Sequence, residues 1–354
     1  MITNIVPIDS QIVFASKLSP GDLLSWCLTS KKISELCDND KFWFYKLDID
    51  YPYMSEKRFD ISNKEMFKRL TLGYGDLYHI NPKTREYEFI KPNIRTIIRG
   101  ISNNQFVIDI HNNLISVEYD KDYLGTPSDD YFYNKEKILR KNVKDLILKS
   151  TTNGYDLLLD KNGDLIAISD EDDNGLIKID ENVKSIGYNG YIKNNNDFYL
   201  LNDQDKPIKI MENVKQYIDV DHQIILTNDN IIYVRDEERE TLKTIIEYKD
   251  DIHYITGLEH EDGTYLLAII FSNGTSLTYL LDENFYILSE LKINSKKLLA
   301  GSTSYYVISL DNILYEIVEK PTGHFKFLPI MNNILDYSPV RGYFISSMEP
   351  DILE

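Results

Sequence analysis

Apolar residues in the first fifty positions recur every three or four residues, the spacing that places them on one face of a helix. Pro7 suits the first turn of such a helix, and Ser19 suits the N-cap of a second. Thr29 or Ser30 and then Asp38 or Asn39 are suited to cap two more. The sequence therefore predicts four short helices between residues 7 and 47, whose apolar residues are Ile8, Ile12, Val13, Leu23, Leu24, Cys27, Leu28, Ile33, Leu36, Cys37, Phe42, Trp43 and Leu47.

A fifth helix is predicted after residue 62. Ser62 and Glu65 have the spacing of a capping box, in which each side chain reaches the backbone N–H of the other. Met66, Phe67 and Leu70 follow on one side of this helix. We expect it to bridge two domains, with residues 51–60 as the loop before it. The predicted organisation is a helical module over 1–48, a linker with the bridging helix over 49–72, and a β domain over 73–354.

From Gly73 onward the pattern changes to short β-rich runs separated by Asn- and Asp-rich turns. A unit recurs that begins with Asn, an apolar residue and a basic residue, as at 142–144, 182–184 and 213–215. Its first apolar residues are Ile94, Val143, Val183, Val214, Ile252, Leu298 and Ile334. Their mean spacing of about 40 residues, with several strands in each unit, is typical of the blades of a β-propeller.

The two ends of the β domain complement each other. The last unit, 333–347, has too few strands for a blade, and the first β segment, 76–80, lacks a preceding pair of strands. Sharing one blade would hide edges that otherwise aggregate. The predicted fold is multidomain and mainly β: a short helical module followed by a propeller of seven blades, closed by its N- and C-terminal strands.

The charge is uneven along the chain. The sequence has 39 Lys and Arg against 57 Asp and Glu, a net charge of −18. The first 72 residues carry ten of each sign, so the whole acidic excess belongs to the β domain. Such a surface repels phosphate backbones, which excludes a nucleic-acid partner, and it serves either solubility or attraction of a basic protein. No apolar run reaches 18 residues, so we expect no membrane partner.

Candidate chemistry is sparse. The six histidines are scattered and form no metal-ligand motif, and neither a phosphate-binding glycine loop nor a Gly-x-Ser-x-Gly motif is present. The acidic stretches 129–130 and 170–173 lack the ligand spacing of a calcium loop. We therefore expect no enzyme, no cofactor and no metal. Cys27 and Cys37 are interpreted as unpaired core residues of a reducing compartment, the cytoplasm or nucleus, in a host cell if the source is viral.

The N-terminal pattern resembles the F-box family over about 45 residues. The features in order are Val6-Pro7, the segment Leu18 to Leu24 (LSPGDLL), Ser30-Lys31-Lys32 and Phe42-Trp43. The resemblance implies that the module docks a Skp-family adaptor and, through it, a cullin. The residues that it implies for adaptor binding are Pro7, Ile8, Ile12, Leu18, Leu23, Leu24 and Trp43.

The repeats resemble the regulator-of-chromosome-condensation propellers more than WD repeats, because no Trp-Asp pair recurs and Gly187, Gly257 and Gly301 match a glycine of that family's motif. The two resemblances together imply the substrate-recognition subunit of an SCF-type cullin ubiquitin ligase. The alternative is a non-catalytic scaffold or exchange-factor-like protein whose helices only cap the propeller. Candidate target-binding anchors, at strand ends or in loops, are Tyr188, Tyr191, Tyr254, Tyr305 and Tyr306.

Overall fold

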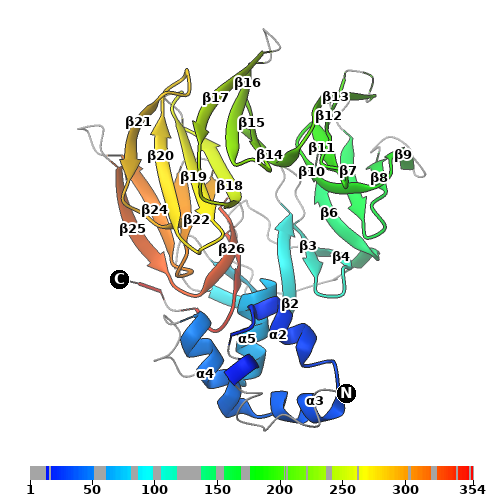
Figure 1. Ribbon diagram of the computed structural model, residues 1–354, viewed down its shortest axis with the longest axis vertical. Coiled ribbons are helices and arrows are strands. Elements are labelled where there is room, and N and C mark those ends of the chain that lie inside the picture. Colours follow the sequence, from blue (N-terminus) through cyan, green and yellow to red (C-terminus); the bar gives the residue numbers. More distant parts are fainter. Residues whose placement is uncertain are drawn as a thin grey trace, which may run out of the picture.

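The computed structural model describes residues 13–15, 17–51, 61–80, 87–98, 105–117, 137–148, 155–168, 176–202, 204, 206–220, 222–236, 241–260, 263–301, 304–319, 325–339, 342–350 and 352–353. The described helices are α2 (Pro20–Trp26), α3 (Lys31–Cys37), α4 (Asp40–Asp50) and α5 (Asn63–Leu72), with a further helical segment at residues 13–15. The other described elements are strands. The helices lie together at one end of the molecule (Figure 1). The mainly β character predicted from the sequence is confirmed.

Four helices begin after the N-cap residues expected from the sequence. The Ser19 hydroxyl accepts from the Asp22 N–H at 3.3 Å, and the Ser62 hydroxyl accepts from the Glu65 N–H at 3.2 Å. Of the alternatives for the middle helices, Ser30 and Asn39 are the caps of α3 and α4. Each cap satisfies a backbone N–H that has no partner within its helix. Of the predicted first helix, Pro7, Ile8 and Ile12 fall outside the described residues, whereas residues 13–15, which include Val13, are helical.

The helices share one buried core. Its buried members are Ala15, Leu23, Cys27, Ile33, Cys37, Phe42, Trp43, Leu47, Met66 and Phe67. The Trp43 indole N–H donates to the Cys37 carbonyl at 2.6 Å, so its polar atom is satisfied inside the core. Met66 and Phe67 come from α5, and Met348 from near the end of the chain packs against the same cluster. Residues outside 1–48 therefore help to complete this core.

The expectation that Cys27 and Cys37 stay unpaired is wrong. The two residues form a disulfide, with their Cα atoms 5.9 Å apart. Cys27 directly follows α2 and Cys37 ends α3, and both side chains face the same core. The short connection between the two helices brings positions ten residues apart in sequence into contact.

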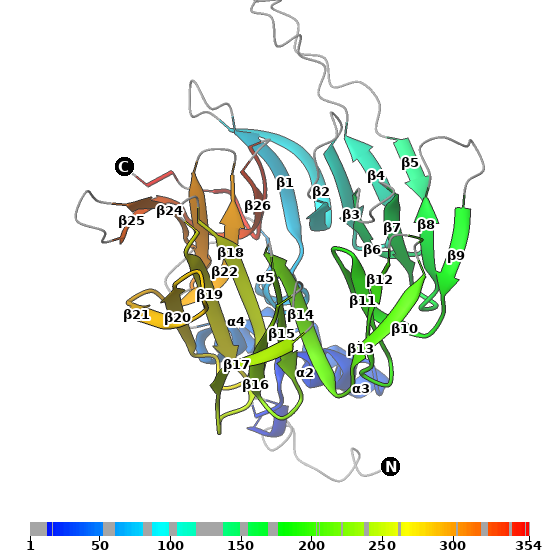
Figure 2. The ribbon, with the colours of Figure 1, turned by 90° about the horizontal axis from the view of Figure 1, so that it is seen from above.

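The described strands form six antiparallel sheets. Five have four strands each: β6–β9 (Val143–Ile147, Asp156–Asp160, Leu165–Ile168, Leu176–Asp180), β10–β13 (Val183–Gly187, Gly190–Lys193, Phe198–Leu201, Pro207–Met211), β14–β17 (Val214–Val220, His222–Thr227, Ile231–Asp236, Thr241–Glu247), β18–β21 (Ile252–Glu259, Tyr265–Phe271, Ser276–Leu281, Ile287–Leu291) and β22–β25 (Ser295–Ala300, Tyr305–Ser309, Leu314–Glu319, Phe325–Met331). The sheets follow one another around a ring, each with its first strand towards the centre (Figure 2). This is the arrangement of a β-propeller.

The sixth sheet has seven strands in the order β26-β27-β1-β2-β3-β4-β5. They are β1 (Gly75–Ile80), β2 (Tyr87–Ile98), β3 (Gln105–Asp109), β4 (Leu114–Val117), β5 (Lys137–Arg140), β26 (Ile334–Ser338) and β27 (Tyr343–Ser346). The first half of β2 pairs with β1 and the second half with β3. Divided at β2, this sheet makes two groups of four strands that share one strand, so the described strands make seven such groups in all.

A repeated backbone hydrogen bond joins successive sheets. The N–H groups of Val143, Val183, Val214 and Ile334, each the first residue of the innermost strand of a four-stranded group, donate at 2.8–2.9 Å to carbonyls of the preceding sheet. The accepting residues are Asn112, Gly163, Asn196 and Asn312, all with positive φ. The anchor predicted at Leu298 is wrong by three positions, because the sheet β22–β25 begins at Ser295, a small polar residue that the apolar pattern passed over.

In five of the seven groups an asparagine in the left-handed conformation comes just before the first strand, or, in β2, just before the part that pairs with β3: Asn93, Asn142, Asn182, Asn213 and Asn333. Because strand order repeats around the ring, these residues lie on one face, which we call the corner face. Helix α5 attaches there. The Arg69 guanidinium donates to Asp76 at 2.8 Å and to the Ser347 carbonyl at 3.1 Å, and the Ser347 N–H donates to the Asn333 carbonyl.

Candidate functional site

The helical module keeps several large apolar side chains at its surface although its core is filled. The exposed ones are Val13, Phe14, Leu28, Phe44, Tyr45, Ile49 and Leu72. Tyr45 and Ile49 are 67% and 57% exposed and lie one turn apart on α4, so they share one face of that helix. Phe14 contacts the partly buried Trp26 edge to face, with ring centroids 6.1 Å apart. An exposed apolar pair such as Tyr45 and Ile49 on one helix face is a surface that a partner protein can cover.

The described residues predicted to bind an adaptor lie elsewhere. Leu23 and Trp43 are fully buried, and Leu18 and Leu24 pack partly buried against the same core. The Leu18 carbonyl accepts a hydrogen bond from the buried Lys46 ammonium at 2.7 Å. Leu23 and Trp43 can therefore contribute to docking only by holding the module in shape. Pro7, Ile8 and Ile12 lie outside the described residues, so their role stays a prediction.

The five tyrosines proposed as anchors do not form one site. Tyr188 is 48% exposed in the turn after β10. Tyr191 is fully buried, and its hydroxyl donates to Asp180 at 2.5 Å, which together with desolvation raises the pKa of Tyr191. The Tyr254 hydroxyl donates to the Lys296 carbonyl at 2.9 Å, and burial raises its pKa to about 12.

Tyr305 and Tyr306 are also engaged in packing. The Tyr305 ring lies 4.6 Å from the His260 ring, and the Tyr306 ring lies 5.2 Å from that of Tyr337. Burial raises the pKa of Tyr306. Among the five tyrosines, Tyr188 thus has the exposure expected of an anchor, and its role stays a prediction.

A more exposed aromatic was missed. Tyr286, in the turn before β21, is 62% exposed, and the Lys243 ammonium lies 3.5 Å from the centroid of its ring. The next two residues, Ile287 and Leu288, are also exposed. Tyr286 follows the Asp282 turn, and this loop position was the only sequence signal that could have singled it out.

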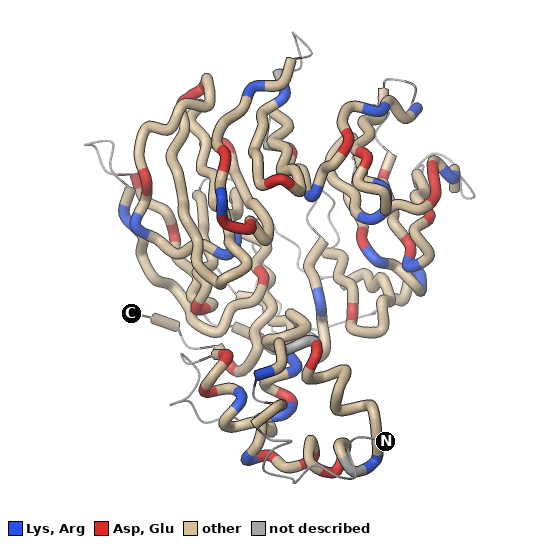
Figure 3. The backbone as a smooth tube through the Cα atoms, in the orientation of Figure 1, with Lys and Arg blue, Asp and Glu red and all other residues tan. Residues whose placement is uncertain are grey.

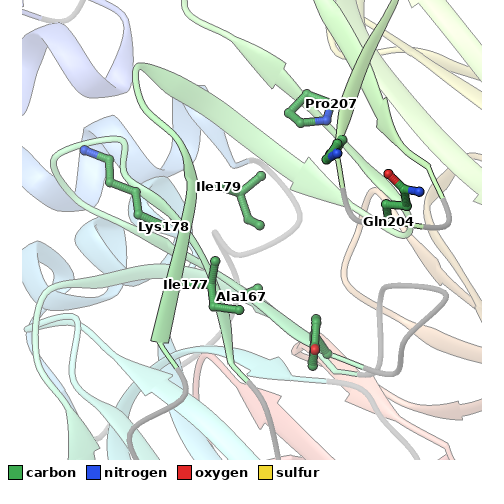
Figure 4. Close-up of a pocket in the computed structure, with 8 residues that line it drawn as sticks. Ala167, Ile177, Lys178, Ile179, Gln204 and Pro207 are labelled. Carbon is green, nitrogen blue, oxygen red and sulfur yellow. The ribbon is translucent and has the colours of Figure 1, made fainter.

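A hollow of about 420 Å³ lies between two neighbouring sheets. Figure 4 shows its lining: Ala167, Ile177, Lys178 and Ile179 come from β8 and β9, and Gln204 and Pro207 come from the segment that leads into β13. Tyr155 and Lys206 complete the lining. The Lys178 ammonium is already paired with Asp164 at 2.9 Å and Glu181 at 3.3 Å, so the hollow offers mainly apolar side chains. None of the five predicted tyrosines lines this hollow.

Both signs of charge are spread over the molecule, and Lys and Arg alternate with Asp and Glu along the helices and the sheets (Figure 3). Within the described ranges, no group of three or more His, Cys, Asp or Glu is placed to hold a metal ion. No described helix combines the length and the apolar character needed to cross a membrane.

No family model matches the sequence, and no curated protein matches it significantly. Among solved structures, Sqt1 of Saccharomyces cerevisiae is similar with a TM-score of 0.48 and 12% identity, over 78% of this chain and 90% of that one. The WD40 propeller domain of Doa1 is similar with a TM-score of 0.45 and 13% identity, over 71% of this chain and 88% of that one. YCF48 bound to a D1 peptide is similar with a TM-score of 0.42 and 12% identity, over 73% of this chain and 94% of that one. The function proposed below therefore rests on the residues of this chain.

Proposed function

We propose that this protein is a non-catalytic substrate-recognition subunit of an SCF-type cullin ubiquitin ligase. Its helical module would dock a Skp-family adaptor, and its propeller would hold a protein target. The observation that carries the proposal is the exposed apolar surface of a module whose own core is already filled. The order of the F-box-like segments between Val6 and Trp43 supports it.

The joint between the two parts suits this role. Arg69 ties α5 to Asp76 at the start of β1 and to Ser347 after β27, and Leu70 packs against both the helical core and the core of β1, β2 and β27. A rigid joint holds a bound target at a fixed distance from the adaptor. The target's effective concentration near the conjugating enzyme then rises without any bond chemistry by this chain.

The target would bind on the face opposite the corner face. Tyr188 lies there, because it follows the end of β10, whereas Asn182 precedes the start of that strand on the corner face. The acidic excess of residues 73–354 favours a basic target, since charges around an interface speed the encounter with a partner of opposite sign. We expect its association rate to fall as salt concentration rises.

The alternative is a scaffold in which the helices only cap the propeller. The burial of Leu23 and Trp43 and the packing of Met348 into the helical core favour it, because these contacts make the module an integral part of the fold. The two functions differ in whether the surface of the module binds an adaptor.

Capture of a purified Skp-family adaptor by the full chain separates them. The double variant Tyr45→Asp/Ile49→Asp should lose at least about tenfold in adaptor affinity, because two apolar contacts become charged. The matched control is Ile208→Asp/Leu242→Asp, two exposed apolar residues on outer strands of the propeller. Both variants should keep the parent melting temperature. An adaptor that binds neither the parent nor the control, or binds all three proteins equally, would favour the scaffold.

A further inference from the structure

Five basic residues occupy one repeated position in the ring. Four of them stand second in the first strand of a four-stranded sheet: Lys144, Lys184, Lys215 and Lys296. Arg95 holds the same position in β2, directly after Ile94, where β2 begins to pair with β3. His253 and Leu335 hold the same position in the two remaining groups. The first strands lie towards the centre of the ring (Figure 2). We call the five residues the basic ring; it lies at the corner face.

Contacts between neighbouring sheets place these side chains around the centre. Arg95 donates to the Lys144 carbonyl at 2.8 Å, and Lys144 donates to the Lys184 carbonyl at 2.5 Å. Lys215 donates to the Ile252 carbonyl of the next sheet. Each of these cations therefore extends sideways to the next first strand and does not point away from the ring.

The remaining contacts of the basic ring are mostly with uncharged groups. Arg95, Lys184 and Lys296 donate to the side-chain amide oxygens of Asn112, Asn196 and Asn312, at 2.8, 3.1 and 2.8 Å. Those amides belong to the left-handed residues of the adjoining turns. The same turns that join the sheets thus also position the cations.

The positive charge is largely uncompensated. In the described part of the chain, no carboxylate lies within 4.0 Å of the charged groups of Arg95, Lys144, Lys184 or Lys296, while Lys215 lies 3.3 Å from the exposed Asp251. Two carboxylates lie nearby: Asp145, whose pKa burial raises, and the buried Asp336, which acts on Lys296 but is itself paired with Lys297 at 2.6 Å. Several like charges on low-dielectric walls focus a positive field, here in a protein of net charge −18.

The ring also retains donors. An arginine has five N–H donors and a lysine has three. Arg95 donates two hydrogen bonds, to Asn112 and to the Lys144 carbonyl, and Lys144 donates one, to the Lys184 carbonyl. Cations spaced around one centre suit a compact ligand with several negative groups, which can meet more than one of them at once; an extended acidic chain crossing the face would meet fewer.

We propose that the centre of the ring at the corner face is a binding site for a compact multivalent anion, one that carries several phosphate or carboxylate groups. The proposal does not rest on the proposed function, since neither the adaptor surface nor the target face includes these residues. The site would lie beside the helical module, which attaches to the same face through Ser347.

The test is a calorimetric titration of the full chain with tripolyphosphate and with citrate, at matched ionic strength. We expect saturable binding of at least one of them. The variant Lys144→Gln/Lys184→Gln should weaken that binding at least about tenfold, because charge-assisted hydrogen bonds are lost. The matched control is Lys206→Gln/Lys326→Gln, two exposed lysines beside the starts of the outer strands β13 and β25, which should leave binding unchanged. Lys144→Arg keeps the charge and should preserve it, which guards against a double variant that fails to fold.

Several outcomes would overturn the proposal. They are no saturable binding of tripolyphosphate or citrate, equal weakening by the control pair, or binding of a glutamate-rich peptide alone. Binding of tripolyphosphate without citrate would assign the site to phosphate groups, and the reverse would assign it to carboxylates.

Discussion

The Arg69 guanidinium on α5 donates to the carbonyl oxygen of Ser347, 278 residues later in the chain, and pairs with Asp76 at 2.8 Å. Arg69 is buried. Arg69→Gln should lower the free energy of unfolding by about 3 kcal/mol, because removal of one partner leaves the partly buried Asp76 carboxylate uncompensated. Urea denaturation measures the change. Lys68→Gln, on the same helix, is the control and should change stability by less than about 0.5 kcal/mol. Equal effects of the two substitutions would show that Arg69 does not secure this joint.

The left-handed asparagines are expected to resist β-branched replacement. Asn182 has φ of 60° and precedes β10, and its carbonyl accepts from the Asn194 N–H at 2.8 Å. Asn182→Val should cost about 1–2 kcal/mol, because a side chain branched at Cβ is strained in this conformation. Asn182→Gly, which removes the same amide without strain, should be close to neutral. If thermal denaturation shows the same loss of stability in both variants, the loss comes from the missing side-chain amide and not from strain in the left-handed backbone.

Phe344 is predicted to be a main support of the closing strands. It is fully buried on β27, and its ring stacks on Tyr78 of β1 with centroids 5.4 Å apart. Phe344→Ala should cost about 3–5 kcal/mol by leaving a cavity between two ends of the chain. Leu288→Ala, at an exposed position on β21, is the comparison and should cost under about 0.5 kcal/mol. A Phe344 variant as stable as the Leu288 variant in urea would contradict this packing.

Lys296 should make stability depend on alkaline pH. Burial, with Lys297 nearby, lowers its pKa from 10.5 to about 8. Below pH 8 the lysine is protonated in both states, so the folded protein bears the full cost of the buried charge. Between pH 8 and 10.5 the folded state releases a proton that the unfolded state keeps, so this contribution favours folding increasingly as pH rises.

The variant Lys296→Met isolates this effect from other titrations. The free energy of unfolding of the parent should rise relative to that of the variant between pH 8 and 10, as measured by urea denaturation at each pH. Parallel curves over this interval would mean that Lys296 has an ordinary pKa in the folded protein.

Features set by neighbouring residues were predictable. Ser19 and Ser62 are recognisable caps because an N-cap acts on an N–H only three residues away. Val143 and Val183 were found as first residues of sheets because the unit of Asn, apolar and basic residue marks the left-handed turn before them. Ser295 was missed because a serine at the same position carries no apolar signal.

Features set by distant packing were not predictable. Leu23 and Trp43 looked available to a partner because the contributions of Met66, Phe67 and Met348 to their core come from outside the predicted module. Tyr191 looked like an anchor because only strand register shows that it faces inward. The lysines of the basic ring were visible in the repeated unit, but their convergence depends on closure of the whole ring.

The pairing of β1 with β27 sets the order in which the protein can be made. Strand β1 leaves the ribosome long before its partner, Tyr343–Ser346, because more than half of the sequence lies between the two strands. At about 5–20 residues per second, β1 waits on the order of tens of seconds with one edge unpaired. During that time the nascent chain presents a strand edge that any other strand can join. Closure of the ring therefore requires that the exposed edge of β1 be protected in the cell until β27 has been synthesised.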